Sequence, residues 1–338
     1  MLTIGYIGNG KSTNRYHLPF VIQRNHIKVK TIYQRNPENE SWNRIPNVNY
    51  ISDLDTLLND ETIDLIVVCT KMNSHYEYAK MVLQHHKHCL VEKPFTETSE
   101  QAKELFDLAR ENGLIVQPYQ NRRFDSDFLT VQKVIESGVL GDLHEIEMHY
   151  DYFRPEVPES STELTVDDAY LYAHGTHTVD QVISYFGKPD DIHYDIRQLL
   201  GKNRMNDYFD LDFYYNSLKI SVKSSYFRIK ERPSFAVYGK KGCFIKQTKD
   251  RQEEHLKLFY MPHHKDFGLD TLEHFGVLTY VDQSNVYQEE KVPTVPGDYG
   301  RIYDDLYEAI VNGEEKAIKD EETIWQLEIL ETGLKTIQ

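Results

Sequence analysis

The sequence predicts an α/β protein in which an N-terminal, doubly wound parallel sheet is followed by a C-terminal α/β domain with an open, mostly antiparallel sheet. Up to about residue 121, short β-type runs alternate with helical patterns, the order that a parallel sheet requires. From about residue 122, apolar and polar residues alternate with period two along runs joined by short turns, which is typical of an antiparallel sheet with one packed face. We therefore expect two domains, 1–121 and 122–338, with a cleft between them.

In the first domain, the run 65–69 is continuously apolar, as suits a central strand that is covered on both faces. Residues 98–112 predict a helix because Thr98 and Gln101 form a capping box and Gly113 stands just past the end. A second helix is expected over residues 74–86. The expected strands are 2–7, 27–33, 64–69, 88–91 and 114–117.

In the second domain, the period-two runs predict strands at 144–152, 209–215, 218–223, 234–238 and 242–246. Helices are expected near 299–312 and 321–335. The open face of this sheet should expose Tyr, Phe and aliphatic side chains, and large exposed apolar patches usually mark association sites. We therefore expect a homodimer or a dimer of dimers.

Composition excludes several classes of protein. With 38 Lys and Arg against 54 Asp and Glu, the formal net charge is −16, which disfavours binding to nucleic acid and to anionic membranes. No apolar stretch approaches the roughly 18 residues needed to cross a bilayer, and no secretory leader is expected. Cys69, Cys89 and Cys243 match no zinc pattern, so reduced thiols in a cytoplasmic protein are expected.

A glycine loop, residues 8–13, follows the first predicted strand directly. In a dinucleotide site, the first glycine permits a tight turn and the second lets the backbone approach the pyrophosphate, which the next helix N-terminus also binds. Gly8 and Gly10 fit this pattern, Lys11 and Ser12 follow them, and Thr13 takes the place of the third glycine. Residues 14–17 are expected to continue the loop, with a helix starting near Pro19.

The same stretch also matches the phosphate-loop pattern, with Gly5, four further residues and then Gly10-Lys11-Ser12. That pattern indicates a nucleoside triphosphatase. However, Gly5 lies inside the predicted strand, and no neighbouring strand ends in an Asp that could order Mg²⁺. A glycine turn without a ligand is the remaining alternative.

The residues after the second strand favour one dinucleotide over the other. A cofactor with a free ribose 2′-hydroxyl usually meets Asp or Glu about 20 residues beyond the glycines, but the sequence here is Gln34-Arg35-Asn36. Arg35, helped by Lys11 and Ser12, can pair with a 2′-phosphate. This favours NADP, with NAD as the alternative. The competing interpretation is a solvated surface arginine.

Glu92-Lys93-Pro94 stands at the carboxyl end of the strand 88–91, where ligands of open α/β sheets bind. A lysine beside a carboxylate in a cleft can direct its ammonium group at a substrate oxygen. The alternative is a surface ion pair worth about 0–1 kcal/mol.

At this point the sequence resembles the Gfo/Idh/MocA oxidoreductases, the relatives of glucose–fructose oxidoreductase and inositol dehydrogenase. The matching features occur in the family's order over nearly the whole chain. They are Gly8-x-Gly10 with His17-Leu18-Pro19, Val68-Cys69-Thr70 with Asn73 and His75, Glu92-Lys93-Pro94-Phe95, Asn121-Arg122-Arg123-Phe124, Gly175-Thr176-His177-Thr178-Val179-Asp180 and Gly239-Lys240-Lys241-Gly242.

The resemblance implies an NAD(P)-binding Rossmann domain followed by an α/β domain whose open sheet commonly forms the dimer interface. It implies that Lys93 and His177 face the substrate over the nicotinamide, with Arg123 nearby. The residues that it implies for the cofactor groove are Cys69, Thr70, Asn73, His75, Glu92, Lys93 and Asn121.

One departure from the family pattern concerns the histidine motif. Ala173 stands where the family usually has Asp. Either Lys93 and His177 manage the proton alone, or Tyr172 or His174 substitutes, or the chemistry is altered.

We therefore expect an NADP-dependent oxidoreductase that acts on a hydroxyl or carbonyl of a sugar, cyclitol or similar small polyol. His177 would act as the base and Lys93 would polarise the oxygen, while Asp180 orients His177, caps the helix or faces water. The alternative for His177 is a buried structural imidazole. No metal is expected. The alternative is a non-catalytic NAD(P)-binding sensor, which the Ala173 departure favours.

Overall fold

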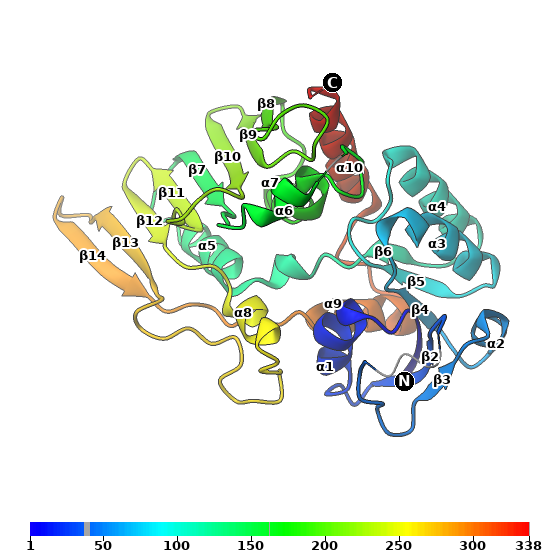
Figure 1. Cartoon of the computed structure of the whole chain (residues 1–338). Helices are drawn as coiled ribbons and strands as arrows, with labels where there is room; N and C mark the ends of the chain where they lie inside the picture. Colours follow the sequence, from blue (N-terminus) through cyan, green and yellow to red (C-terminus); the bar gives the residue numbers. More distant parts are fainter. Residues whose placement is uncertain (37–40, 162, 338) are drawn as a thin grey trace. The chain divides into compact units, whose positions relative to one another are not determined.

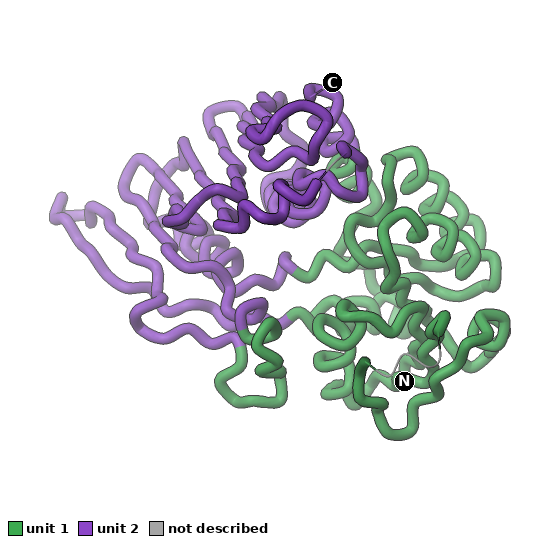
Figure 2. The backbone as a smooth tube through the Cα atoms, viewed as in Figure 1, with its two compact units in different colours: residues 1–121, 255–267, 299–327 green, residues 122–254, 268–298, 328–338 purple. Residues whose placement is uncertain are grey.

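The computed structural model describes residues 1–36, 41–161 and 163–337. The chain forms two compact units, each assembled from separate segments (Figure 2). The first unit comprises residues 1–121, 255–267 and 299–327, and the second comprises residues 122–254, 268–298 and 328–338. The division into two continuous domains at residues 121 and 122 stays a prediction.

The first unit is built on a six-stranded sheet with the order β3-β2-β1-β4-β5-β6 (Figure 1), in which every neighbouring pair is parallel. The order changes direction beside β1, so the carboxyl ends of β1 and β4 form the switch point where open sheets bind ligands. The short strand β3 was not predicted. The strands are β1 (Leu2–Ile7), β2 (Ile27–Tyr33), β3 (Asn49–Ile51), β4 (Leu65–Val68), β5 (His88–Val91) and β6 (Val116–Pro118).

The helices predicted in the first unit are present with slightly shorter bounds. Thr98 caps α4 by accepting the Gln101 backbone N–H at 3.2 Å, whereas the Gln101 side chain accepts the N–H of Glu97, so the capping box is displaced by one residue. The expected loop over residues 14–17 is wrong, because Thr13–His17 forms a π-helical turn. The helices are α1 (Leu18–Val21), α2 (Leu54–Leu58), α3 (His75–Gln84), α4 (Ser99–Glu111) and α9 (Arg301–Tyr307), with short helical turns at Met72–Ser74 and Glu308–Asn312.

The second unit is built on an eight-stranded sheet with the order β14-β13-β12-β11-β7-β10-β9-β8. Only β7 and β10 pair in parallel among the described strands of this sheet, and the other pairs are antiparallel. The strands are β7 (Leu143–His149), β8 (Asp191–Arg197), β9 (Tyr208–Tyr215), β10 (Leu218–Ser225), β11 (Phe235–Gly239), β12 (Gly242–Lys246), β13 (Gly276–Val281) and β14 (Tyr287–Val292).

Further helices lie in the C-terminal two-thirds of the chain. Among them, α5 contacts β11 and β12, and α7 contacts β10. The helix α10 begins in the first unit and ends in the second. They are α5 (Ser126–Glu136), α6 (Glu156–Ser160), α7 (Thr176–Phe186), α8 (Arg251–Lys257) and α10 (Asp320–Lys335), with short helical turns at Asn121–Phe124 and Leu171–Gly175.

The two faces of the second sheet differ in chemistry. On one face, residues such as Ile146 and Met148 of β7 are buried in the core. On the other face, Lys219 lies 3.6 Å from Glu145, and Lys223 lies 3.5 Å from Asp210. The expectation of an apolar open face is therefore wrong for β7, β9 and β10, because the polar residues of the period-two pattern form a ladder of ion pairs there.

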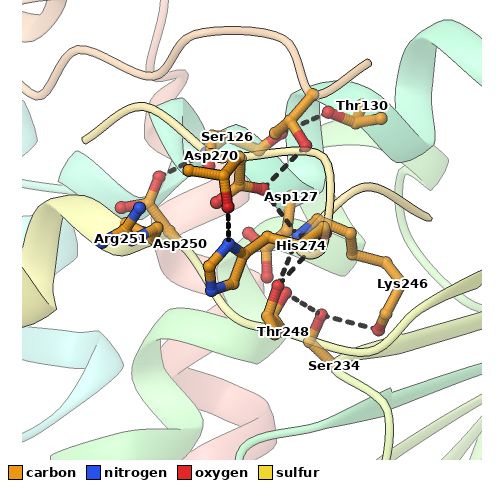
Figure 3. A network of polar contacts seen from close by, with 12 residues as sticks. Ser126, Asp127, Thr130, Ser234, Lys246, Thr248, Asp250, Arg251, Asp270 and His274 are labelled. Carbon is orange, nitrogen blue, oxygen red and sulfur yellow. Dashed lines mark hydrogen bonds and ion pairs between the residues drawn. The ribbon is translucent and has the colours of Figure 1, made fainter. Parts of the chain in front are cut away.

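A buried polar network lies in the second unit (Figure 3). Lys246 is fully buried and its Nζ lies 2.8 Å from Oδ2 of Asp270. Two further carboxyls, Asp127 and Asp250, are 4% and 5% exposed. Burial and the charge of Asp250 raise the pKa of Asp127 to about 6, although Lys246 acts in the opposite direction. The Asp127 carboxyl group is therefore more readily protonated in this network than it is when exposed to water.

Asp127→Asn is expected to stabilise the protein at about pH 7.5 and to change little at about pH 4. The folded carboxyl titrates near pH 6, while the unfolded one titrates near pH 4. The folded state therefore loses stability as pH rises through this window, and the loss persists above it. A neutral amide removes about 1–3 kcal/mol of this cost, which urea unfolding at both pH values measures. Asp167→Asn, at an exposed site, is the control, and a destabilised Asp127→Asn at the higher pH would contradict the assignment.

Candidate active site

The glycine loop leaves β1 with a backbone that only glycine fits. Gly8 has a φ of +111°, and an added Cβ would lie 2.3 Å from the Cys69 carbonyl oxygen. Around Gly10, by contrast, no heavy atom lies within 4 Å of an added Cβ, so open space borders the loop backbone. Thr13 donates its hydroxyl hydrogen to the Gly8 carbonyl at 2.8 Å. The residue in the third glycine position therefore closes the loop on itself.

Gly5 does not belong to this loop. It lies within β1, and an added Cβ would come within 2.7 Å of the Leu57 side chain. Gly5 is therefore a core position where β1 packs against α2. This placement removes the first glycine that a phosphate loop needs, and it argues against a nucleoside triphosphatase.

Glu92 joins the glycine loop to the end of β5. Its Oε1 accepts the hydroxyl hydrogen of Ser12, and its Oε2 accepts the backbone N–H of Lys93 at 2.9 Å. Burial raises the pKa of Glu92, but the hydrogen bonds from His17 and from the Lys93 backbone, together with the charge of Lys93, act against it, and the pKa lies below its usual value. Lys93 itself is half-buried, and its bond to Pro94 is cis.

Other residues predicted for the cofactor groove lie near the ends of β4 and β5. His75 Nδ1 lies 2.8 Å from the Pro94 carbonyl oxygen, and its Nε2 lies 3.1 Å from that of Thr70. His75 is 1% exposed, so it braces the backbone beneath the predicted groove. Cys69 is buried, and its burial raises the pKa of the thiol well above the ordinary value. Asn73, by contrast, is exposed. A role in cofactor binding stays a prediction for these residues and for Asn121, which is buried.

Arg35 lies at the exposed end of β2. A hydrogen bond with the Tyr78 side chain of α3 raises the pKa of its guanidinium. Beside it, Gln34 is buried and accepts the side-chain N–H of Asn9 at 2.8 Å. Lys11 is exposed, whereas Ser12 is bonded to Glu92. The end of β2 thus presents a cation and no carboxylate at residues 34–36, the last that the structure describes before residue 41.

In the second unit, the histidine motif lies at the start of α7. His177 is the second residue of α7 and is 8% exposed. Arg123 binds both carboxylate oxygens of Asp180, at 2.8 and 2.7 Å. Asp180 is 2% exposed, so the expectation that it faces water is wrong, and both of its oxygens accept hydrogen bonds from the guanidinium group. A role of Asp180 in orienting His177 stays a prediction.

The neighbours of Ala173 differ in accessibility. Tyr172 is 1% exposed, while Ala173 and His174 are half-buried. His174 Nε2 lies 3.2 Å from the Tyr226 hydroxyl, and its ring centroid lies 4.9 Å from that of Tyr152. His174 is thus the accessible titratable neighbour of Ala173, and Tyr226 is a partner that the sequence analysis missed.

No group of three or more His, Cys, Asp and Glu side chains in the described parts of the chain is arranged to hold a metal ion. Among the residues that the structure describes, none of the helices combines the length and the apolar character that a membrane crossing needs.

Comparison with known proteins identifies both halves of the chain. Residues 2–120 match the family model described as "Oxidoreductase family, NAD-binding Rossmann fold", and residues 132–338 match the one described as "Oxidoreductase family, C-terminal alpha/beta domain". The chain belongs to the Gfo/Idh/MocA family of oxidoreductases. The family that the motifs predicted is thereby confirmed, as are the parallel sheet and the mostly antiparallel one.

Relatives within the Gfo/Idh/MocA family match along the full length of the chain. The uncharacterized oxidoreductase YhhX of Escherichia coli is 47% identical over 99% of this chain and 96% of its own length. The scyllo-inositol 2-dehydrogenase (NADP(+)) IolW of Bacillus subtilis is 30% identical over 99% of this chain and 93% of its own length. A crystal structure of a probable oxidoreductase yhhX matches with a TM-score of 0.93 and 46% identity, covering 99% of this chain and 97% of that one.

The glycine loop fits the nicotinamide dinucleotide that this family's N-terminal domain binds. The tight turn at Gly8 and the open space at Gly10 are the features that an approaching pyrophosphate requires. The sequence analysis missed two residues next to Glu92: His17 in a structural role, whose Nε2 lies 3.0 Å from Glu92 Oε1, and Tyr303 of α9, whose hydroxyl lies 2.6 Å from His17 Nδ1. The first lay in a quoted motif without an assigned role, and nothing in the sequence pointed to the second.

Proposed function

We propose that the protein is an NADP-dependent oxidoreductase that transfers a hydride between the nicotinamide and a hydroxyl or carbonyl group of a sugar, cyclitol or similar small polyol. The observation that carries the proposal is the attachment of the glycine loop to the strand end that bears Lys93, through Glu92. The glycine loop and the backbone that carries the Lys93 side chain thereby belong to one hydrogen-bonded unit. The name of IolW, a dehydrogenase of a cyclitol, supports the substrate class.

In the proposed mechanism, the nicotinamide supplies hydride transfer when bound. His177 takes the proton from the substrate hydroxyl as the C–H bond breaks, and in the reverse direction it protonates the carbonyl oxygen. The Lys93 ammonium donates a hydrogen bond to the same oxygen. This interaction strengthens as negative charge develops there. Arg123, Tyr172 and His174 remain candidates for the substrate site, and His174 is the accessible candidate for the place of the missing Asp.

Direct binding and turnover measurements test the proposal. Calorimetry with NADPH, NADH and ATP in separate titrations is expected to show tight binding of the reduced dinucleotide and none of ATP. The loaded protein, mixed with a panel of keto-sugars and inososes, is expected to oxidise the nicotinamide. Dinucleotide binding without turnover on any carbonyl or polyol would favour the second candidate, a non-catalytic sensor, which Ala173 supports by leaving the family's usual carboxylate absent.

Arg35→Gln is expected to weaken NADPH binding by about tenfold or more and to leave NADH binding unchanged, because a 2′-phosphate loses a charge-assisted hydrogen bond. Calorimetry with each dinucleotide measures both effects. Lys28→Gln removes the same charge from an exposed site on β2, the strand that precedes Arg35, and should alter neither affinity. Tighter binding of NADH than of NADPH by the unaltered protein would contradict the NADP assignment.

We also propose a homodimer or dimer of dimers that forms through the charged face of the second sheet. Ammonium and carboxylate groups on β7, β9 and β10 can pair with the same groups of a second copy about a two-fold axis. Light scattering at micromolar concentration should give at least a dimeric mass. Changing Lys219 and Lys223 together to Glu should lower it, whereas Lys240→Glu, at an exposed turn, should not. A monomeric mass for the unaltered protein would overturn this assembly.

A further inference from the structure

We propose that His17 and Tyr303 are positioning residues that hold Glu92 between the glycine loop and Lys93. Through Glu92 they hold the glycine loop in place, and they thereby determine how tightly the pyrophosphate and the nicotinamide half of the dinucleotide are bound. We call Ser12, His17, Glu92 and Tyr303 the clasp. The proposal deepens the proposed function and rests on it.

The clasp is a continuous chain of hydrogen bonds within the first unit. His17 Nε2 lies 3.0 Å from Glu92 Oε1, and His17 Nδ1 lies 2.6 Å from the Tyr303 hydroxyl. The Tyr303 hydroxyl in turn lies 3.1 Å from that of Tyr6 on β1. His17 and Tyr303 are 0% exposed and Glu92 is 7% exposed. Water therefore offers these groups little replacement for a lost partner, and each bond is costly to remove.

The chemistry of these groups gives the chain a direction. A neutral imidazole has one N–H and one acceptor nitrogen. When the Tyr303 hydroxyl donates to His17 Nδ1, the single ring hydrogen lies on Nε2 and is directed at Glu92. The Tyr6 hydroxyl then donates to the Tyr303 hydroxyl. In this arrangement the side-chain N–H of His17 and the two tyrosine O–H groups each have an acceptor. The bond at Nδ1 thus selects the tautomer that Glu92 needs.

Packing fixes the orientation of the imidazole. The Tyr119 ring lies against it with a centroid distance of 3.9 Å and an interplanar angle of 30°, and the Tyr6 ring meets it edge-on at 6.2 Å. The helix α9 that carries Tyr303 is anchored by the next residue, Asp304, which accepts two hydrogen bonds from Arg24 at 2.8 and 2.9 Å. This anchor also holds Tyr303 in place. The ring of His17 therefore presents Nε2 to Glu92 in one orientation.

Glu92 transmits this order to both sides of the predicted cofactor site. Its carboxylate accepts hydrogen bonds from Ser12 of the loop, from His17 and from the backbone of Lys93. A buried carboxylate that loses one of three donors is less well held. Loss of the Tyr303 hydroxyl should therefore loosen the loop and Lys93 together, although Tyr303 is assigned no contact with the cofactor.

The test compares Tyr303→Phe with the unaltered protein by calorimetry, using NADPH and adenosine 2′-monophosphate as probes. The monophosphate carries the 2′-phosphate assigned to Arg35 but lacks the pyrophosphate that the loop binds and the nicotinamide. We expect NADPH binding to weaken by about five- to thirtyfold, and binding of the monophosphate to stay within about twofold. A general loss of folded structure would weaken both probes alike, so the difference between them separates positioning from stability.

Two further variants keep the outcome decisive. His17→Gln retains a side-chain N–H that can donate to Glu92, so it should bind NADPH better than His17→Ala does. This pair replaces Tyr303→Phe if thermal unfolding shows that the latter does not fold. Tyr185→Phe removes a half-buried hydroxyl in the second unit and serves as the control.

Equal weakening of both probes, or NADPH binding by Tyr303→Phe that matches the unaltered protein, would overturn the clasp and leave the proposed function intact. Failure of the unaltered protein to bind any dinucleotide would overturn the proposed function and the clasp with it.

Discussion

Replacing Lys93 with Met is expected to lower the rate of hydride exchange by about 10²–10³-fold, while NADPH binding stays within about threefold. The ammonium group is proposed to act mainly where negative charge develops on the substrate oxygen, so its loss raises the barrier more than it weakens the ground state. Met is chosen because it keeps an unbranched chain of similar length. The hydrogen bond from the Lys93 backbone to Glu92 does not depend on the side chain, so the clasp should remain in place.

Stopped-flow measurement of nicotinamide absorbance, with calorimetry for NADPH, reads the two quantities separately. Lys71→Met removes the same charge from an exposed site in the same unit and should leave both unchanged. A Lys93→Met variant with at least a third of the original rate would remove Lys93 from the proposed mechanism.

Replacing His177 with Gln is expected to lower kcat/KM for a polyol by about 10²–10⁴-fold, the usual contribution of a general base. Gln can still form a hydrogen bond with the substrate, but it cannot take up a proton. Binding of the dinucleotide should be unaffected, because His177 is proposed to contact the substrate and not the cofactor. Initial rates in both reaction directions measure the effect, since the same group would return the proton when the carbonyl is reduced.

The control is His193→Gln, at an exposed position of β8, which should retain full activity. If His177→Gln kept activity within about tenfold of the original while His174→Gln lost it, the role of the base would move to His174. That result would also explain how the chain manages without the Asp that Ala173 replaces.

The fold could be predicted from the sequence because its signals are local. The apolar run 65–68 and the alternation along β9 and β10 reflect burial on two faces or on one. The elements β3 and α2 were missed, since they have three and five residues and too few positions to show a period. The longer elements β8, β13, β14 and α5 were not predicted either. The sequence predicts a loop over residues 14–17 because Pro19 favours a helix start near it, whereas the helical turn begins at Thr13.

Residues of the candidate site could be placed from the sequence only where their motif directly follows an element that the sequence also predicts. Glu92 and Lys93 follow a strand, so their place at its end was foreseeable. The bond between His17 and Tyr303 joins residues 286 positions apart, and no local pattern reveals such a pair. Asp180 was read from its helical spacing to His177, but Arg123, 57 positions away, binds it. Contacts between distant segments were therefore the part that sequence reasoning could not reach.

The central claim is that Lys93 and His177 serve one substrate oxygen beside the nicotinamide. A crystal structure of the protein with NADP⁺ and a polyol that it oxidises tests this claim most directly. The account predicts that Nζ of Lys93 and one ring nitrogen of His177 both lie within about 3.2 Å of the same hydroxyl oxygen. Nitrogens too far apart to share one oxygen, in a complex that turns over in the crystal, would contradict it.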